Sequence, residues 1–165
     1  MKKTISVFVP AYNEERYLSD TIKNTKKALK SLSCDYEILI FDDCSKDKTG
    51  VIADELAKND NKIRVRHNPK NMGIGCNYTK GIELASKDFF MLIPGDDDIP
   101  LQNIKDVLRC IGKADIINPY FINPFEVRSL DRVIISKCFV KFMNILMGLD
   151  LKYYSGLVVH KSKLI

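Results

Sequence analysis

The sequence predicts an α/β fold: a doubly wound, mostly parallel sheet with helices on both faces, forming a single domain. Short apolar stretches alternate along the chain with longer amphipathic ones, in the order of strands joined by crossover helices. Several of the short stretches are mainly apolar, as strands buried on both faces are. The chain has 165 residues, the length of one domain that buries most of its apolar surface.

The N-terminal elements follow this alternation. Residues 5–10 (ISVFVP) are apolar apart from Ser6 and rich in β-branched side chains, which predicts a buried strand. Residues 14–32 carry apolar side chains at near-helical spacing, and we expect Asn13 to cap this first helix. Residues 36–41 (YEILIF) predict the second strand, and residues 45–59 open with Ser and Asp and continue as an amphipathic helix.

The remaining elements complete the sheet. Residues 62–67 (KIRVRH) alternate between apolar and polar and predict a strand, and residues 74–86 predict a helix. Residues 89–94 (FFMLIP) predict the fourth strand, residues 101–111 a helix, and residues 114–121 (ADIINPYF) a fifth strand. In such sheets ligands bind at the carboxyl ends of the strands, so the polar residues after each strand are the candidate site.

Two polar clusters follow the first two strands. Pro10 cannot donate to a sheet and is expected to end the pairing, after which Tyr12 offers an aromatic face and Glu14 an acceptor. Taken alone, this cluster is better explained by a simple turn with a helix cap. Asp42 and Asp43 leave the second strand, and adjacent acids suit hydrogen bonds to a ribose or a base N–H, with an ordinary loop as the alternative.

A glycine-rich stretch precedes the third helix. Gly73, Gly75 and Gly81 lie within residues 68–81 (NPKNMGIGCNYTKG). The stretch is not a dinucleotide-binding fingerprint, because Tyr78 stands where that motif needs glycine, and it is not a P-loop. It predicts either a flexible turn into a helix or a close approach of the backbone to a ligand.

Three consecutive acids, Asp96, Asp97 and Asp98, follow the fourth strand directly. Two carboxylates about 4 Å apart repel by roughly 4 kcal/mol at an effective dielectric of 20, so solvent, a raised pKa or a cation must offset that cost. In an extended segment Asp96 and Asp98 would point the same way. Such oxygen ligands suit Mg²⁺ or Mn²⁺ shared with substrate phosphates, and a solvated acidic turn is the alternative.

Composition narrows the functional classes. The net charge of +5 is mild and is not the dense basic stripe of a nucleic-acid-binding protein, so no nucleic-acid partner is expected. The five cysteines lie far apart and form no metal-binding pair, which indicates reduced thiols in the cytoplasm. The N-terminus lacks a signal peptide's apolar length and cleavage site, and no segment is long enough to span a membrane.

The motifs VFVPAYNE, IFDDCSKDKT, NPKNMGIGCNYTKGIELA and FFMLIPGDDDIP, taken together, resemble the family-2 inverting glycosyltransferases of the GT-A fold over about residues 4–100. The resemblance implies that the first two motifs hold the nucleoside of a nucleotide-sugar donor, and that the acids hold a Mg²⁺ or Mn²⁺ ion on its diphosphate. The donor-binding residues implied in this way are Pro10, Ala11, Tyr12, Glu14, Asp43, Gly73, Asp96 and Asp97.

The acidic motif departs from the family pattern D-x-D-D-x-x-P. Alignment on Pro100 places Pro94 at the first aspartate and Asp96 at the last aspartate of D-x-D, the expected metal ligand. A register shifted by two residues would instead pair Asp96 with Asp98. The metal ligands expected are therefore Asp96, with Asp98 as a second ligand.

The C-terminal third resembles the polyprenyl-phosphate branch, such as dolichyl-phosphate mannose synthases. Arg132, Ser136 and the pair Ser155–Gly156 match its pattern, which implies a lipid-phosphate acceptor, with Arg128 and Arg132 on the phosphate side. Residues 133–147 are apolar on all sides and too short to span. They predict either a core or homo-oligomer helix or an interfacial helix on the inner face of the cytoplasmic membrane.

This organisation divides the chain into a nucleotide-sugar-binding core at residues 1–121 and an acceptor-side segment at residues 122–165 that ends early for the family. No residue stands out as a general base, so the catalytic residues are not predicted. Three alternatives stay open: a nucleotidyltransferase, which VPAYNE does not favour, a non-catalytic or truncated nucleotide-sugar-binding module, and a transferase with a soluble saccharide acceptor.

Overall fold

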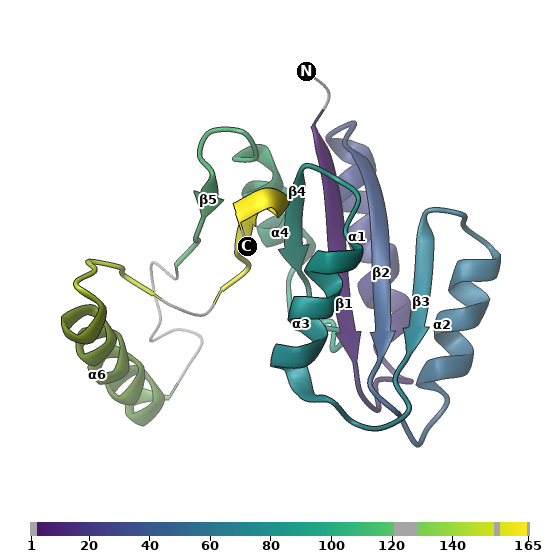
Figure 1. Ribbon diagram of the computed structural model, residues 1–165, viewed down its shortest axis with the longest axis horizontal. Helices are drawn as coiled ribbons and strands as arrows, with labels where there is room; N and C mark the ends of the chain where they lie inside the picture. The colour runs from purple at the N-terminus through teal and green to yellow at the C-terminus, as the bar shows by residue number, and fades with distance from the viewer. Residues whose placement is uncertain (1–2, 121–128, 154–155, 165) are drawn as a thin grey trace. The chain divides into compact units, whose positions relative to one another are not determined.

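The computed structural model describes residues 3–120, 129–153 and 156–164 (Figure 1). The chain divides into two compact units, one formed by residues 1–117 together with 159–165 and the other by residues 118–158. The strands are β1 (Thr4–Ala11), β2 (Asp35–Asp42), β3 (Ile63–His67), β4 (Phe89–Leu92), β5 (Ile116–Ile117) and β6 (Val159–Lys161). The helices are α1 (Leu18–Ser31), α2 (Thr49–Lys58), α3 (Gly73–Leu84), α4 (Leu101–Arg109), α6 (Leu130–Met147) and the short 3₁₀ turn η1 (Ser162–Leu164).

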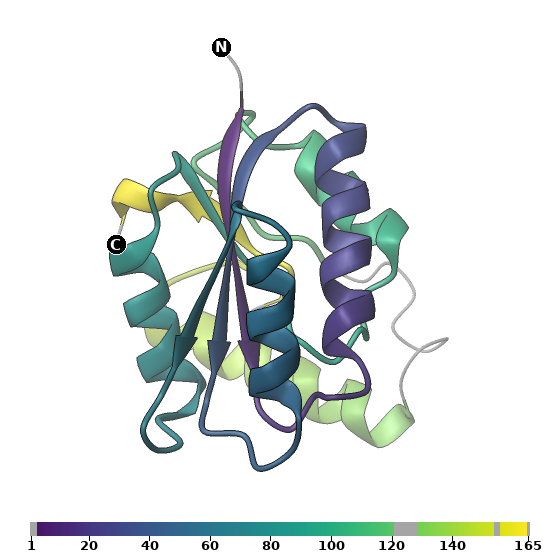
Figure 2. The ribbon, with the colours of Figure 1, turned by 90° about the vertical axis from the view of Figure 1, so that its right-hand side faces the viewer.

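The first unit is a six-stranded sheet in the order β3-β2-β1-β4-β6-β5, with helices on both of its faces (Figure 2). Strands β1 to β4 are parallel, and their loops after β1, β2 and β4 reach the same edge. Helix α1 packs with α2 and α4, while α3 packs on β1 from the opposite face. The doubly wound, mostly parallel α/β fold is therefore confirmed.

The far edge of the sheet differs from the expectation. Of the strand predicted at residues 114–121, the described residues 114–120 form only Ile116–Ile117. This strand pairs antiparallel with β6, which in turn pairs antiparallel with β4. Strand β6 was not predicted, because three residues at 159–161 are too few to show a period. The apolar run at 114–121 could not reveal that its partner comes from the other end of the chain.

Aromatic packing holds β1, β2 and β4 together. Phe8, Phe41 and Phe90 are buried, and the rings of Phe8 and Phe41 meet edge to face with centroids 5.0 Å apart. Helix α3 approaches this cluster closely, because a Cβ at Gly81 would lie 2.9 Å from the Phe8 ring. The central strands, and hence the loops at their carboxyl ends, rest on this rigid core.

Helix α6 of the second unit contrasts with the helices of the sheet. It spans 18 residues, and among them only Val133 is buried. Its exposed apolar side chains are Leu130, Ile134, Ile135, Phe139, Phe142, Ile145, Leu146 and Met147. No helix in the part of the chain that the structure describes has the length and apolar character needed to cross a membrane.

Candidate functional site

The loops that follow β1 and β2 are joined by hydrogen bonds. The backbone N–H of Asn13 donates to Ser45 Oγ at 3.0 Å, and the N–H of Lys46 donates to Asn13 Oδ1 at 2.8 Å. Asn13 has φ of 59°, a left-handed conformation that asparagine tolerates better than most residues. The prediction that Asn13 caps α1 is wrong: the helix begins at Leu18 after Tyr17, and Asn13 instead binds the neighbouring loop.

Pro10 lies inside β1 and does not end it. It pairs with Phe41 in register, and its carbonyl accepts the N–H of Gly95 at 3.2 Å. Ala11 is the last residue of the strand, and its carbonyl accepts the N–H of Asp43 at 2.9 Å. The expectation that Pro10 stops the pairing is therefore wrong, because a strand interior tolerates proline where its missing donor is not required.

Asp43 is buried at the carboxyl end of β2, with 6% of its surface exposed. Its Oδ1 accepts hydrogen bonds from Asn68 Nδ2 at 2.7 Å and the Met72 N–H at 2.8 Å, and its Oδ2 accepts the Gly73 N–H at 3.0 Å. Burial alone would raise the pKa of Asp43, but these hydrogen bonds and that of Asn77 outweigh it and hold the pKa below its ordinary value. The structure thus places a buried, ionised carboxylate at the edge of the sheet.

Asp42, the neighbour of Asp43, is occupied by contacts within the fold. Its Oδ1 accepts the Ser45 N–H at 3.0 Å, and its Oδ2 lies 3.0 Å from His67 Nδ1. The other ring nitrogen of His67 lies 3.1 Å from Asp54 Oδ1. The hydrogen bond to Asp42, opposed by burial and aided by Asp54, raises the pKa of His67. Asp42 therefore fixes the loop beside Asp43.

The third side of the site follows β4. A Cβ at Gly95 would lie 3.1 Å from the Pro10 carbonyl oxygen and 3.3 Å from Ala11 Cβ, so only glycine brings this loop so close to β1. The Gly95 carbonyl also accepts the hydroxyl of Thr21 in α1 at 3.1 Å. These contacts bring the loop that carries Asp96, Asp97 and Asp98 beside the end of β1.

The three acids form a turn and not the extended segment expected from their sequence. Asp97 has φ of 55°, and the Asp98 N–H donates to Asp96 Oδ1 at 3.3 Å. The Asp97 carboxylate accepts the Asn24 amide at 3.1 Å, which directs it toward α1. The charges of Asp96 and Asp98 both act on Glu14, although the extended geometry expected for the two acids is wrong.

Glu14 lies within the electrostatic influence of three neighbouring acids. Desolvation is the largest effect and raises the pKa of Glu14, and the charges of Asp96, Asp47 and Asp98 raise it further. No cluster of three or more acids, histidines or cysteines within the described ranges is arranged to hold a metal ion by itself. The donor set at Asp96 and Asp98 instead fits an ion shared with substrate phosphates, because Mg²⁺ commonly takes only one or two carboxylates from the protein.

Tyr12 directly follows β1, and Gly73 is the first residue of α3. Tyr12 is 43% exposed. Gly73 opens α3 with φ of 76° and donates its N–H to Asp43, and a Cβ at either Gly73 or Gly75 would meet no atom within 4 Å. The sequence left two interpretations of this stretch, a turn into a helix or a close approach to a ligand. Gly73 supports the turn, because its backbone N–H binds Asp43.

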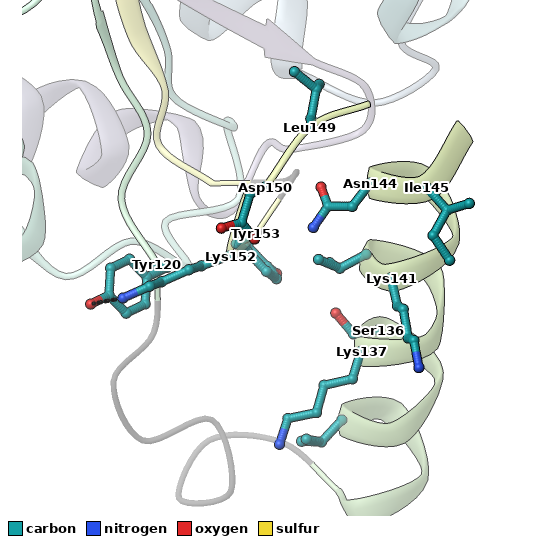
Figure 3. Close-up of a pocket in the computed structure, with 12 residues that line it drawn as sticks. Tyr120, Ser136, Lys137, Lys141, Asn144, Ile145, Leu149, Asp150, Lys152 and Tyr153 are labelled. Atoms are coloured by element: carbon teal, nitrogen blue, oxygen red, sulfur yellow. Dashed lines mark hydrogen bonds between the residues drawn. The ribbon is translucent and has the colours of Figure 1, made fainter. Parts of the chain in front are cut away.

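The acceptor-side residues lie in or near the second unit. Arg132 is exposed on α6, and Ser136 on the same helix lines a cavity of about 480 Å³ (Figure 3). A Cβ at Gly156 would lie 2.9 Å from the Pro119 carbonyl oxygen, so this position requires a small residue. Arg128 and Ser155 lie outside the described residues.

The cavity combines apolar and charged side chains. Its residues come from α6 and from the segments on either side of it: Tyr120, Val133, Ser136, Lys137, Val140, Lys141, Asn144, Ile145, Leu149, Asp150, Lys152 and Tyr153. The Lys152 ammonium lies 3.3 Å from the Tyr120 hydroxyl and 4.7 Å from the centre of its ring. Asn144 accepts the Leu151 N–H at 3.1 Å and donates to its carbonyl at 2.8 Å, which fixes the segment after α6.

Sequence reasoning missed two residues of the site, Asn68 and Asn77. Both are buried, and the Asn68 amide donates to Asp43 Oδ1 at 2.7 Å and to Asn77 Oδ1 at 2.6 Å. Asparagine before a proline and asparagine within a helix both have ordinary explanations, so neither position signals a role. A buried polar residue becomes recognisable only when its partner is known.

Two comparisons of sequence give the relatives of this chain. A family model described as Glycosyl transferase family 2 matches residues 6–142. EpsH of Bacillus subtilis is 35% identical over 124 residues, which are 74% of this chain and 35% of EpsH. The dolichol-phosphate mannosyltransferase of Pyrococcus furiosus is 31% identical over 113 residues, 68% of this chain and 31% of the enzyme. The chain therefore spans about a third of the length of these curated relatives.

Solved structures agree on the fold. The mannosyl-3-phosphoglycerate synthase of Rubrobacter xylanophilus matches with a TM-score of 0.76 at 16% identity, over 98% of this chain and 54% of that one. S. aureus TarS in complex with UDP matches with a TM-score of 0.55 at 26% identity, over 74% of this chain and 38% of that one. Because the family model covers most of the chain and the sheet matches these enzymes, the chain belongs to glycosyl transferase family 2 and has the GT-A fold.

Proposed function

We propose that this chain is the donor-binding part of an inverting glycosyltransferase that moves a hexose from a UDP- or GDP-sugar to an acceptor. One observation supports this proposal. The same edge of the sheet carries a buried, ionised Asp43 and the acids Asp96 and Asp98, whose charges act on Glu14. A nucleotide sugar needs both parts: a fixed acceptor for its nucleoside and cation ligands for its diphosphate.

The nucleoside is proposed to lie against Asp43 and Tyr12. Tyr12 is exposed enough to stack on a base or ribose, and Asp43 is an ionised acceptor. Ala11 and Gly73 serve this end through backbone hydrogen bonds to Asp43, and Pro10 accepts the N–H of Gly95 beside them. TarS, which is 26% identical over the matching region, was solved with UDP, and this supports a nucleotide at the equivalent place here.

The diphosphate is proposed to share Mg²⁺ or Mn²⁺ with Asp96 and Asp98. Such an ion, when bound, neutralises the charge that develops on the leaving nucleoside diphosphate. Burial is the largest cause of the raised pKa of Glu14, and the charges of Asp96, Asp47 and Asp98, which a bound cation would offset, raise it further. Asp97 contributes by fixing the turn to Asn24 of α1, which keeps its neighbours beside β1.

The acceptor is proposed to be a polyprenyl phosphate. The relative named dolichol-phosphate mannosyltransferase supports this class, and Arg132, with Arg128 outside the described residues, would meet its phosphate. A phosphate oxygen is already nucleophilic, so the reaction needs no general base, in keeping with the lack of one in the predicted motifs. One displacement by that oxygen on the face opposite the leaving diphosphate inverts the anomeric carbon.

Helix α6 is proposed to meet the anionic inner face of the cytoplasmic membrane, where such an acceptor would be found. Its exposed apolar side chains include Ile135 and Phe142, at 67% and 61% exposure. Lys137 and Lys141 lie on the same helix, and a basic residue near an anionic leaflet contributes about 1 kcal/mol to binding. The competing proposal is that the same apolar side chains of α6 contact a second copy of the chain.

The test is release of nucleoside diphosphate from a panel of UDP- and GDP-sugars, with Mn²⁺, with and without a short-chain polyprenyl phosphate. We expect release from one donor to rise when the lipid phosphate is added and to fall to background in Asp96→Asn. Release with a soluble saccharide alone would replace the lipid acceptor. Failure of every nucleotide to bind would overturn the donor site itself.

A further inference from the structure

We propose that Thr49 is a positioning residue of the nucleotide site: its buried hydroxyl joins the loops after β1 and β2 into one unit that holds Tyr12 and Asp43 in place before the nucleotide binds. The inference rests on the proposed function, because it assumes that these two residues meet the nucleoside. It goes further by giving a role in binding to a residue that need not touch the donor.

Residues 13–15 after β1 and residues 45–49 after β2 bind each other in both directions. Among the described residues, five hydrogen bonds join the two segments, each from a backbone N–H of one to a side chain of the other. They run from Asn13 to Ser45 at 3.0 Å, from Glu14 to Thr49 at 2.7 Å, from Glu15 to Asp47 at 3.2 Å, from Lys46 to Asn13 at 2.8 Å and from Lys48 to Glu15 at 3.0 Å. Neither segment can therefore shift without breaking hydrogen bonds to the other.

Thr49 connects these segments to a helix. It is the first residue of α2 and has no exposed surface. Its hydroxyl accepts the N–H of Glu14 at 2.7 Å and donates to Asp47 Oδ1, and the other oxygen of that carboxylate accepts the N–H of Glu15. One buried hydroxyl thus fixes the backbone of the first loop to the second loop and to the start of α2.

The same loops carry the proposed nucleoside contacts. Tyr12 directly precedes Asn13, and both residues are exposed, so packing alone does not hold this part of the chain. Asp43 lies at the start of the second loop, where its N–H donates to the Ala11 carbonyl at 2.9 Å. A site that is ordered before its ligand arrives avoids the cost of ordering it on binding.

The hydroxyl can be removed with little change of shape, because valine closely matches threonine in size but has no polar atom in its side chain. In Thr49→Val the N–H of Glu14 loses its acceptor. A donor left without a partner inside the fold is costly, so we expect the first loop to leave this arrangement and reach water. Thr49→Ser keeps the hydroxyl and removes only a methyl group.

The first experiment measures by calorimetry the affinity of UDP, with Mn²⁺, for the wild type, Thr49→Val and Thr49→Ser at a temperature where all are folded. We expect Thr49→Val to bind UDP about 3- to 10-fold more weakly, the factor for ordering one side chain on binding. Thr49→Ser should restore the wild-type affinity.

Thr25→Val is the matched control for this series. Thr25 in α1 has no exposed surface either, and its hydroxyl has no hydrogen-bond partner among the residues that the structure describes. The control removes an unpaired buried hydroxyl, so it should melt no lower than the wild type. It should also bind UDP with the wild-type affinity.

The second experiment follows amide hydrogen exchange by NMR in the chain without nucleotide. The N–H groups of Asn13 and Lys46 do not bind Thr49, but each binds the opposite loop. In Thr49→Val we expect both to exchange about tenfold faster through local opening, and to slow again when UDP and Mg²⁺ bind. The N–H of Ile38, which donates to the Lys62 carbonyl inside the sheet, should keep its wild-type rate.

Two outcomes would overturn the inference. Thr49→Val that melts lower but binds UDP as the wild type does would leave Thr49 with a structural role only. Unchanged exchange at Asn13 and Lys46 in that variant would show that Thr49 does not couple the loops.

Two further results keep the test decisive. Should Thr49→Val fail to fold, Ser45→Ala, at a half-buried position, removes the acceptor of the Asn13 N–H. We expect the same loss of affinity there, and wild-type affinity would overturn the inference. No binding of UDP or GDP to the wild type would overturn the proposed function instead, and exchange in the free chain would still decide whether Thr49 couples the loops.

Discussion

Asp43 holds the neighbouring loop through three hydrogen bonds and is proposed to bind the nucleoside as well. In Asp43→Asn an amide nitrogen must face one of the donors at Asn68, Met72 or Gly73, so we expect a loss of about 1–3 kcal/mol in the free energy of unfolding. Nucleotide and nucleotide-sugar affinities should fall by similar factors, because the lost contact is to the nucleoside. Urea denaturation and calorimetry measure the two effects. A variant that loses only the increment due to the sugar would show that Asp43 meets the other end of the donor.

His67 gives a pH dependence at the residue scale. Its pKa is raised by the hydrogen bond to Asp42, with Asp54 adding to the effect, so the stability it contributes is complete below its unfolded pKa of about 6.5. That contribution is lost as the pH rises through the higher folded pKa. His67→Gln should therefore cost most below pH 6, by up to about 1 kcal/mol for such an exposed pair, and least at pH 9. A difference in melting temperature that grows toward pH 9 would contradict this sign.

Among the connecting elements, the loop after β4 depends on Gly95. A Cβ there would meet the Pro10 carbonyl oxygen at 3.1 Å, so Gly95→Val should cost about 1–3 kcal/mol and weaken metal-dependent nucleotide binding by moving Asp96. Gly75→Ala is the control for stability, because a Cβ at Gly75 meets nothing within 4 Å and alanine favours a helix by up to about 1 kcal/mol. Equal melting temperatures for Gly95→Val and the wild type would remove the close approach from the account.

Helix α6 provides the prediction for the membrane. We expect the chain to sediment with vesicles that contain phosphatidylserine at low salt and to be released at high salt, as screening predicts. The double variant Phe139→Ser, Phe142→Ser should bind less while keeping its melting temperature, because both side chains are more than half exposed. Val51→Ser, at an exposed valine on α2, should bind as the wild type does. Wild-type chain that stays in the supernatant would favour a soluble acceptor, and a variant that dissociates an oligomer would favour a second copy on α6.

At the scale of the whole molecule, the sequence predicts those strands that form one clear apolar run along the chain. Strands β1, β2 and β4 are mainly apolar runs, interrupted only by Ser6 in β1 and Glu37 in β2, and all three lie where these runs predict. The edge could not be predicted in the same way, since β5 has two residues and its partner β6 lies more than forty residues later in the chain. Short strands that pair antiparallel across the sequence carry almost no local periodicity.

The candidate site shows the same division. The positions of Asp43, Asp96 and Glu14 at one edge follow from the topology alone, because parallel strands end on the same side. The contacts that orient them could not be predicted: Asn13 binds Lys46 in place of capping α1, and Asn77 reaches Asp43 through Asn68. Such contacts depend on side chains far apart in sequence, whose roles look ordinary until the fold brings them together.

The central claim, a metal-linked nucleotide site at the carboxyl edge of the sheet, is tested most directly by thermal unfolding with UDP and Mn²⁺ in the wild type and in Asp96→Asn. Binding to the folded state alone stabilises it by about 2.7 kcal/mol at a hundredfold excess over Kd. We predict that UDP raises the melting temperature of the wild type only with Mn²⁺, that EDTA abolishes the shift, and that Asp96→Asn loses most of it. Equal shifts in the wild type and the variant, with and without EDTA, would contradict the claim.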